Sequence, residues 1–200
     1  MLVLPKNLSD PLVVGVGHHR ACYIHPQDSK KCIKVIHNPC DHAMQEIRRE
    51  ISYYGILNSR LKDWRGLPRF YGTIETNLGK GYVYDRIVDF DGKPSQTIEQ
   101  RYNSDNLPEL HDELRALIDT LRRYVRDNLI VTMSIKPYNI LCHRISETEI
   151  FPVICDNIGT SSLIPVEIYC PWFCRKKQDR QFKRFEELPL IQTLKNRIAF

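Results

Sequence analysis

Four groups of residues in this chain of 200 residues are of types that can bind a phosphate or a divalent cation. Gly15 and Gly17 lie one residue apart between strand-like residues, and such a pair lets a backbone approach phosphates closely. Lys34 lies inside an apolar strand-like run, where a buried charge needs a charged partner. Asn139 lies in a polar loop and offers a neutral oxygen, and Asp156 follows an apolar run and can bind a hard cation. These residue types indicate a site for a phosphorylated ligand and its metal.

Each of these features also has a purely structural interpretation. A glycine pair can serve only its turn, a strand lysine can face solvent at a sheet edge, and an aspartate near a glycine can cap the next segment. Lys136, in the same loop as Asn139, can add a phosphate contact. The functional interpretation therefore requires a fold that brings the four groups together.

Composition places the chain among ordinary globular proteins, with 42% hydrophobic and 26% charged residues. No run of 18 apolar residues is present, which excludes a membrane-spanning helix by sequence. The first residues lack the pattern of a secretory signal, and we therefore expect a cytoplasmic protein. The seven cysteines are odd in number and include no C-x-x-C pair, which favours buried reduced thiols over a zinc site.

The net charge of +5 is concentrated at the C-terminal end. Residues 175–200 hold eight basic and three acidic side chains, whereas the rest of the chain holds 21 of each. The basic ones are Arg175, Lys176, Lys177, Arg180, Lys183, Arg184, Lys195 and Arg197. A basic tail can attract nucleic acid or an anionic membrane surface, although a solvated basic helix face is the simpler interpretation.

Hydrophobic periodicity predicts a β-rich first part and a more helical second part. The first part has strands within 12–25 and 30–37, a helix over 42–58 with Asp41 as its N-cap, and paired strands over 67–75 and 81–88. After a polar stretch at 95–106, an apolar stripe from Leu107 to Val125 predicts a long helix that stops at Asn128. A short strand at 129–132, a hairpin of 139–144 against 150–155, and basic helices with Phe182, Phe185 and Leu188 inward complete the chain.

This order resembles an α+β, protein-kinase-like fold. The resemblance implies a single compact domain over 1–200, with a small β-rich N-lobe at 1–87 and a shortened, mainly helical C-lobe at 88–200. Gly15 and Gly17 match the first two glycines of the loop over ATP, with Arg20 in place of the third. Lys34 matches the lysine that contacts the phosphates and pairs with a helix glutamate, for which Glu50 is the best match and Glu46 the alternative.

The same resemblance supplies the remaining site residues. Tyr84, Asp85, Arg86 and Ile87 match the hinge that meets adenine through backbone groups. Asn139 and Asp156 match the two ligands of Mg²⁺. The implied cofactors are therefore ATP and Mg²⁺.

Longer motifs make the resemblance more specific than the fold level. They are RRE-x-x-YY at 48–54, LKDW-x-G-x-PR-x-(Y/F)GT at 61–73, GYVYD at 81–85, DFDGKPS at 89–95, VTMS-x-KP-x-NILCHRIS at 131–146 and CDNIG at 155–159. Together they resemble the YrbL family of bacterial PhoP regulatory network proteins over nearly the whole chain. The family name implies a link to the response to low magnesium and envelope stress.

Three departures from the kinase pattern affect the expected activity. Ser134 stands where the catalytic aspartate belongs, and a serine is no anionic proton acceptor at neutral pH. The metal motif reads D-N-I-G, with one residue added. Only 44 residues follow Asp156, and no A-P-E-like element is visible. The departures leave two hypotheses open, an atypical phosphotransferase that uses Lys136 and a pseudokinase that regulates a partner protein. For an enzyme, they favour a small molecule or lipid headgroup as substrate.

Overall fold

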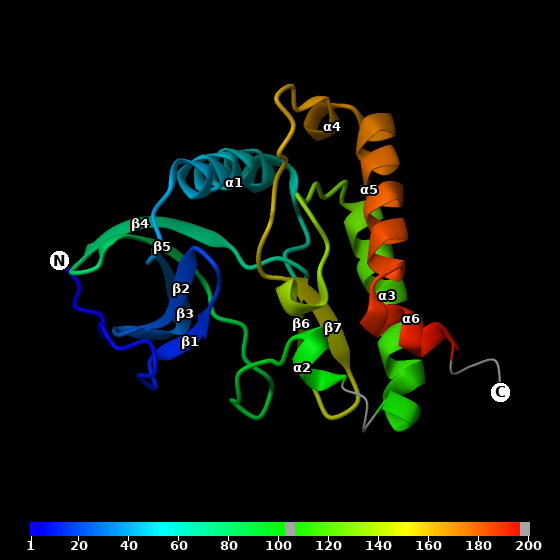
Figure 1. The fold of residues 1–200 in the computed structure, drawn as a ribbon, viewed down its shortest axis with the longest axis horizontal. Coiled ribbons are helices and arrows are strands. Elements are labelled where there is room, and N and C mark those ends of the chain that lie inside the picture. The colour runs from blue at the N-terminus through cyan, green and yellow to red at the C-terminus, as the bar shows by residue number, and fades with distance from the viewer. Residues whose placement is uncertain (103–106, 197–200) are drawn as a thin grey trace.

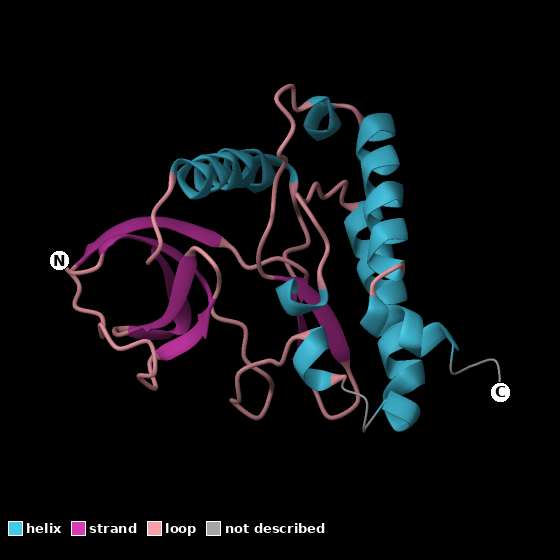
Figure 2. Ribbon diagram, in the orientation of Figure 1, coloured by secondary structure: helices cyan, strands magenta, loops and turns pink. Residues whose placement is uncertain are grey.

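The computed structural model describes residues 1–102 and 107–196. An antiparallel sheet with one helix across it forms the first part of the molecule, and a β-hairpin with most of the helices forms the second (Figure 1). Figure 2 shows this separation by type of element. The predicted α+β class, with the sheet first and helices later, is confirmed.

The five strands of the first part form one sheet in the order β1-β2-β3-β5-β4, with all neighbours antiparallel. Its elements are β1 (Val13–Val16), β2 (Arg20–His25), β3 (Asp28–Ile36), α1 (Asp41–Arg60), β4 (Phe70–Thr76) and β5 (Gly79–Asp85). Gly79, at the tight turn between the last two strands, has φ 101°, which glycine adopts without strain.

The second part is built around the antiparallel hairpin of β6 (Ile140–Arg144) and β7 (Ile150–Ile154). Its helices are α2 (Ile98–Arg101), α3 (Leu107–Asp127), α4 (Val166–Tyr169), α5 (Pro171–Glu186) and α6 (Pro189–Asn196), and a 3-10 turn, Pro137–Asn139, precedes the hairpin. The long helices α3 and α5 lie side by side, and α3 packs on β7 (Figure 1).

Strand alternation divides the sheet into two differently buried faces. Ile33 and Val35 of β3 point into a small apolar cluster with Ala21, Tyr23 and Val83. Cys32 belongs instead to the large core that α1, the hairpin and the long helices share. Lys34, two residues on from Cys32, therefore points towards α1 and the second part of the molecule.

Two local predictions are wrong. Helix α1 is capped by Cys40 rather than Asp41, because the Cys40 thiol accepts the Ala43 N–H at 3.4 Å. Residues 129–132 form no strand; Leu129 has a positive φ of 50°, and only Thr132 pairs, through an isolated bridge to Ile158. The chain turns at Leu129 because α3 has just ended, and this turn interrupts the extended run.

The long amphipathic helices follow their predicted patterns. In α3 the buried stripe is Leu114, Leu117, Leu121, Tyr124 and Val125, while the side chain of Leu107 lies outside the described residues. Phe182 and Phe185 of α5 are buried as predicted, and Leu188 packs against the same core. The polar stretch at 95–106 includes the short helix α2, and its last four residues lie outside the described part.

The cysteines are free thiols, as expected, but only Cys32, Cys142 and Cys174 are buried. Cys22, Cys155 and Cys170 are half-buried, and Cys40 is exposed. Among the described residues, no helix is both long and apolar enough to cross a membrane.

Candidate functional site

Strand register brings the predicted lysine into a group of polar and aromatic side chains. Cys22 of β2 lies opposite Lys34 of β3, and Lys34 lies opposite Tyr82 of β5. Because side chains alternate between faces, Arg20 and Tyr84, each two residues along from those partners, share the Lys34 face. The Lys34 ammonium also lies 4.9 Å from the centre of the Tyr84 ring, within cation–π range.

Helix α1 contributes a carboxylate to this face. Glu50 is almost completely buried, and it accepts hydrogen bonds from Arg20 at 2.9 Å and from the Tyr84 hydroxyl at 2.7 Å. Glu46, the alternative from the sequence, lies one turn earlier and pairs with His42 at 3.8 Å. Neither glutamate forms an ion pair with Lys34 in the described structure. The expected lysine–glutamate pair is thus replaced by an arginine–glutamate pair.

Asp156 joins the same group from the end of β7. Its carboxylate lies 3.7 Å from the Lys34 ammonium and also pairs with Arg20. Lys34 in addition donates to the Cys155 carbonyl at 2.6 Å. We name Arg20, Lys34, Glu50 and Asp156 the charge cluster; it holds two cations and two carboxylates.

The pKa values in the charge cluster favour ionised groups. Burial alone lowers the pKa of Lys34, but the Asp156 and Glu50 carboxylates, together with Cys155, more than offset this and hold that pKa above its ordinary value. For Asp156, burial raises the pKa, yet Lys34 and Arg20 outweigh it and the net shift is downward. Burial also raises the pKa of the neighbouring Cys155 thiol to about 12. Asp156 is therefore an ionised carboxylate at neutral pH, beside a thiol that is neutral.

The segment after Asp156 has an unusual backbone that ties it to the predicted catalytic loop. Asn157 has φ 60° and Gly159 has φ 113°, a region that asparagine and glycine tolerate best. The Asn157 side chain donates to the Ser134 hydroxyl at 2.8 Å, and its carbonyl accepts the Met133 N–H at 2.7 Å. The serine in place of the catalytic aspartate is therefore held by the D-N-I-G segment itself.

The loop before β6 places Asn139 next to the charge cluster. The Asn139 carbonyl accepts the Cys155 N–H at 2.9 Å, so Asn139 is joined to the residue that precedes Asp156. The Asn139 N–H donates in turn to the Lys136 carbonyl at 3.0 Å, closing the 3-10 turn. Asn139 is buried and Lys136 is half-buried.

The glycine pair lies on and just after β1, the edge strand of the sheet. A Cβ atom at Gly15 would meet nothing within 4 Å, and neither Gly15 nor Gly17 has a left-handed backbone. The Gly17 N–H donates to the Arg20 carbonyl at 2.8 Å, which closes the turn into β2. The fold itself therefore requires no glycine at position 15.

The expected hinge begins at the end of β5, where the Tyr84 side chain contacts the charge cluster. The Asp85 and Arg86 N–H groups already donate within the protein, to the Arg69 carbonyl at 3.1 Å and the Lys30 carbonyl at 2.8 Å. The Ile87 carbonyl accepts the Ser95 N–H at 3.5 Å. Tyr84 turns its hydroxyl to Glu50 instead. Two of the backbone donors assigned to adenine by resemblance are thus already used.

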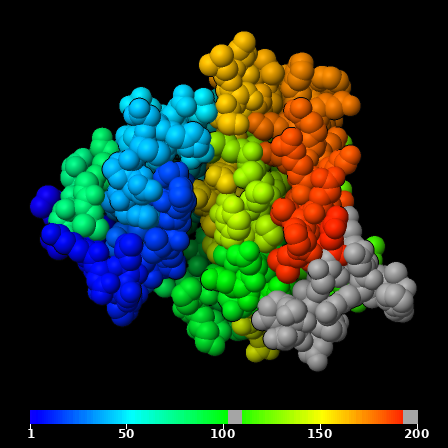
Figure 3. Space-filling view, viewed as in Figure 1, coloured from blue at the N-terminus to red at the C-terminus, as the bar shows by residue number. Residues whose placement is uncertain are grey.

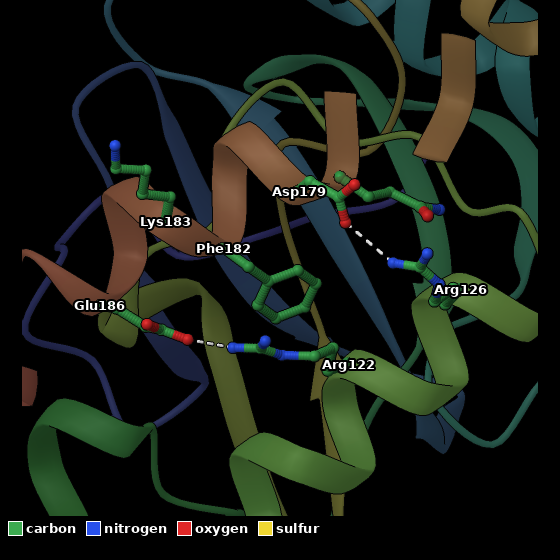
Figure 4. Close-up of a pocket in the computed structure, with 7 residues that line it drawn as sticks. Arg122, Arg126, Asp179, Phe182, Lys183 and Glu186 are labelled. Carbon is green, nitrogen blue, oxygen red and sulfur yellow. Dashed lines mark hydrogen bonds and ion pairs between the residues drawn. The ribbon is translucent and has the colours of Figure 1, made fainter. Parts of the chain in front are cut away.

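A separate hollow of about 170 Å³ lies between α3 and α5. Phe182 lies between two ion pairs that join the helices, Arg122 with Glu186 and Arg126 with Asp179 (Figure 4). Small-molecule sites usually enclose roughly 300–1,000 Å³. The hollow is smaller than that and is spanned by paired charges, so we treat it as part of the helix–helix contact.

The sequence did not predict that the side chains of Arg20 and Tyr84 would bind Glu50. Arg20 was matched only to a missing glycine, although an arginine at the start of an otherwise apolar strand is itself a sign of a buried partner. The kinase pattern concerns only the backbone of Tyr84, so it gives no sign that the Tyr84 hydroxyl binds Glu50.

The protein is a mixed α+β protein with a five-stranded antiparallel sheet. Its candidate site lies where Lys34 of the sheet contacts Asp156 of the second part of the molecule. Residues 7–189 match the family model described as PhoP regulatory network protein YrbL, and the chain belongs to that family. It is 52% identical over 185 residues to a protein of Escherichia coli (strain K12) described as uncharacterized protein YrbL, covering 92% of this chain and 88% of the relative. The protein of the same description from Shigella flexneri matches to the same extent.

Proposed function

We propose that the chain is a kinase-like protein that binds ATP with Mg²⁺ at Lys34, Asn139 and Asp156. One observation carries the proposal: the Lys34 ammonium on the sheet lies 3.7 Å from the Asp156 carboxylate, which follows the hairpin. A lysine that contacts phosphates and an aspartate that holds their metal must meet at one place for such a ligand to bind.

The arrangement of elements supports the kinase-like part of the proposal. The lysine strand β3 is followed by one helix and then by β4 and β5, and the sheet order is β1-β2-β3-β5-β4. Asn139 comes just before the β6–β7 hairpin and Asp156 just after it. The metal ligands of a kinase-like site follow the same order along the chain.

The donor chemistry fits a magnesium ion that shares its ligands with a nucleotide. Magnesium is usually held by one or two carboxylates together with substrate phosphates and water. Asp156 supplies an ionised carboxylate and Asn139 an amide oxygen. Within the described residues, no three His, Cys, Asp or Glu side chains are grouped as a metal site, so phosphates and water would complete the coordination.

The catalytic loop favours binding over turnover. Ser134 replaces the usual proton acceptor and is hydrogen bonded to Asn157, and Arg20 already pairs with the metal aspartate. General-base assistance is worth about 10² to 10⁴ in rate. We therefore favour a pseudokinase, a nucleotide-gated regulatory protein, over the phosphotransferase hypothesis. Regulation by Mg-ATP would suit the PhoP regulatory network of the family name.

Thermal unfolding with and without Mg-ATP tests the proposed binding. A ligand at 100 times its Kd stabilises the folded state by about 2.7 kcal/mol, so the melting temperature should rise with nucleotide concentration. Lys34→Ala and Asp156→Asn should each remove most of that rise. Lys80→Ala and Asp119→Asn change exposed residues outside the cluster and should keep it. A wild-type melting temperature unchanged at saturating Mg-ATP would refute the proposal.

A turnover assay separates the two hypotheses once binding is shown. Wild-type protein should release no phosphate from ATP above the background of the Asp156→Asn variant. Ser134→Asp restores a carboxylate at the base position and tests whether that group alone is missing. Phosphate release or transfer by the wild type that Asp156→Asn abolishes would establish a phosphotransferase and exclude the pseudokinase.

A further inference from the structure

Large apolar side chains gather in the open around α4 and the start of α5. They are Leu163, Ile164, Val166, Tyr169, Trp172 and Phe173, which we call the apolar tip. Leu163 is 92% exposed and Tyr169 is 72% exposed. This segment projects beyond α1 at the top of the molecule (Figures 1 and 3). Contiguous exposed apolar surface commonly marks an interaction site.

The apolar tip is held in place by a polar network beneath it. Glu167 is buried and accepts hydrogen bonds from Lys177 at 2.8 Å, from Ser162 at 2.7 Å and from Thr160. Arg60 of α1 donates to the Ile168 carbonyl at 2.9 Å. These hydrogen bonds fix the backbone that carries the exposed apolar side chains.

A basic face of α5 continues from the apolar tip. At 100° per residue, Trp172, Lys176, Arg180 and Lys183 lie on one side of the helix, and all four are exposed. The Lys176 ammonium lies 5.5 Å from the centre of the Trp172 ring. Lys183 follows Trp172 by roughly 16 Å along the axis at 1.5 Å per residue. Apolar and basic side chains thus share one elongated surface.

Few acidic side chains lie along this surface, and the exposed Glu187 comes one turn beyond Lys183 at its far end. Between Leu163 and Lys183 the sequence has only two acids, Glu167 and Asp179. Glu167 is buried against Lys177, and Asp179 pairs with Arg126 of α3 at 2.8 Å. The exposed surface from the apolar tip along α5 is therefore positively charged as well as apolar.

We propose that the apolar tip and the basic face of α5 dock on an anionic lipid bilayer. Aliphatic and aromatic side chains of an interfacial helix enter the boundary between headgroups and acyl chains, while its cations meet lipid phosphates. Tryptophan and tyrosine favour that boundary. Leu163, Ile164 and Val166 have no ring to stack on a base, which disfavours nucleic acid. Two copies meeting through this surface would bring like charges together.

Binding of the full chain to vesicles tests this surface. Wild-type protein should float with vesicles of phosphatidylcholine plus about a quarter phosphatidylglycerol, and not with phosphatidylcholine alone. Each cation near the membrane surface should raise the partition coefficient onto the vesicles about fivefold. Lys176→Gln with Arg180→Gln should therefore lower that coefficient by roughly 25-fold. The matched control, Lys62→Gln with Lys80→Gln, removes two exposed lysines elsewhere and should bind as the wild type does.

The apolar contribution is tested with Trp172→Ser plus Phe173→Ser, which should abolish flotation. Phe90→Ser, at a partly exposed phenylalanine outside the apolar tip, is the control that should retain it. If the double variant does not fold, Leu163→Ser with Ile164→Ser replaces it, because both side chains are largely exposed. Flotation that is equal on both vesicle types, or indifferent to these variants, would overturn the proposal.

Fluorescence separates the bilayer from other partners. The chain has two tryptophans, Trp64 and Trp172, so Trp64→Phe leaves Trp172 as the only one. Its emission should shift to the blue with anionic vesicles and stay unchanged with duplex DNA. A shift with DNA alone would overturn the proposal in favour of nucleic acid. A doubled mass in light scattering that Trp172→Ser plus Phe173→Ser reverses would overturn it in favour of a dimer.

Discussion

Arg20 of β2 and Glu50 of α1 form an ion pair at 2.9 Å in which both side chains are largely withdrawn from solvent. The pair ties the first helix to the sheet at the position where the kinase pattern expects a lysine. Glu50 accepts a second hydrogen bond from Tyr84, so the carboxylate is satisfied from two strands. Arg20 also reaches Asp156, so it joins the sheet, the helix and the segment after the hairpin.

Removing the cation of this pair should be costly. Arg20→Met leaves the buried Glu50 carboxylate without its cation, with only the Tyr84 hydrogen bond remaining, and breaking a buried pair costs about 3–5 kcal/mol of unfolding free energy. Adding Glu50→Gln should recover part of that loss, because the double variant holds no unpaired charge. Arg48→Met, at an exposed position of the same helix, should change stability by less than about 0.5 kcal/mol. Urea unfolding measures all four proteins, and equal losses in the single and double variants would contradict the coupling.

Arg20 should also compete with magnesium for Asp156. Arg20→Gln keeps a donor for Glu50 but removes the cation from Asp156, a pairing in which the carboxylate is partly exposed and which is worth up to about 1 kcal/mol. If the proposed site binds Mg-ATP, the Kd for Mg-ATP should fall by about threefold to fivefold. Calorimetric titration measures this, with Arg48→Gln as the control. Weaker binding by Arg20→Gln would instead mean that the guanidinium contacts the phosphates.

Glu167 should make stability depend on acid pH. Burial raises its pKa, but the hydrogen bonds from Lys177, Thr160 and Ser162 outweigh it and lower the pKa from 4.5 to about 2. The folded state therefore binds the proton less readily than the unfolded state, and this stabilisation is present above pH 4.5. It should be lost as the pH falls from about 4.5 to about 2, and the shift corresponds to roughly 3 kcal/mol.

Comparison of Glu167→Gln with the wild type by urea unfolding isolates that contribution. The difference in unfolding free energy should be largest near neutral pH and should shrink below about pH 4.5. Glu187→Gln, at an exposed position after α5, should show no such trend. A difference between wild type and Glu167→Gln that is the same at neutral and acid pH would exclude this role for the carboxylate.

Local patterns in the sequence were enough for most elements of the fold. The strand-like run of β3 and the apolar stripe of α3 depend only on neighbouring residues, and both are found close to their predicted bounds. Cys40 rather than Asp41 caps α1 because the helix begins at Asp41, one residue earlier than the sequence pattern predicts. The expected strand at 129–132 was wrong because apolar residues can also be buried in a turn, as Ile130 and Val131 are.

The site was only partly predictable, because partners across the molecule depend on packing distances. Alternation puts Arg20 and Lys34 on one face, but only the placement of α1 decides which of them reaches Glu50. The exposure of Trp172 could not be predicted from the sequence either, because a large aromatic side chain in a helix is usually expected to be buried. Its neighbour Cys174 is buried while Trp172 is 60% exposed, a difference that the rotation of α5 sets.

Gly66 should tolerate no side chain, for a reason that lies across the core. A Cβ atom there would lie 2.3 Å from the ring of Tyr124, which is buried and donates to the Asp63 carbonyl at 2.8 Å. Gly66→Ala must displace the ring, and overpacking of this kind costs about 1–3 kcal/mol. In a Tyr124→Ala background the same substitution should cost much less, because the clashing ring atoms are gone.

The matched control for Gly66→Ala is Gly55→Ala in α1. A Cβ atom at Gly55 would meet nothing within 4 Å, and the residue is exposed. Alanine is favoured over glycine inside a helix by about 0.8–1.0 kcal/mol, so this variant should be more stable than the wild type. The two glycine variants should therefore move the urea midpoint in opposite directions. A shift in the same direction for both would mean that the contact with Tyr124 does not control the tolerance at Gly66.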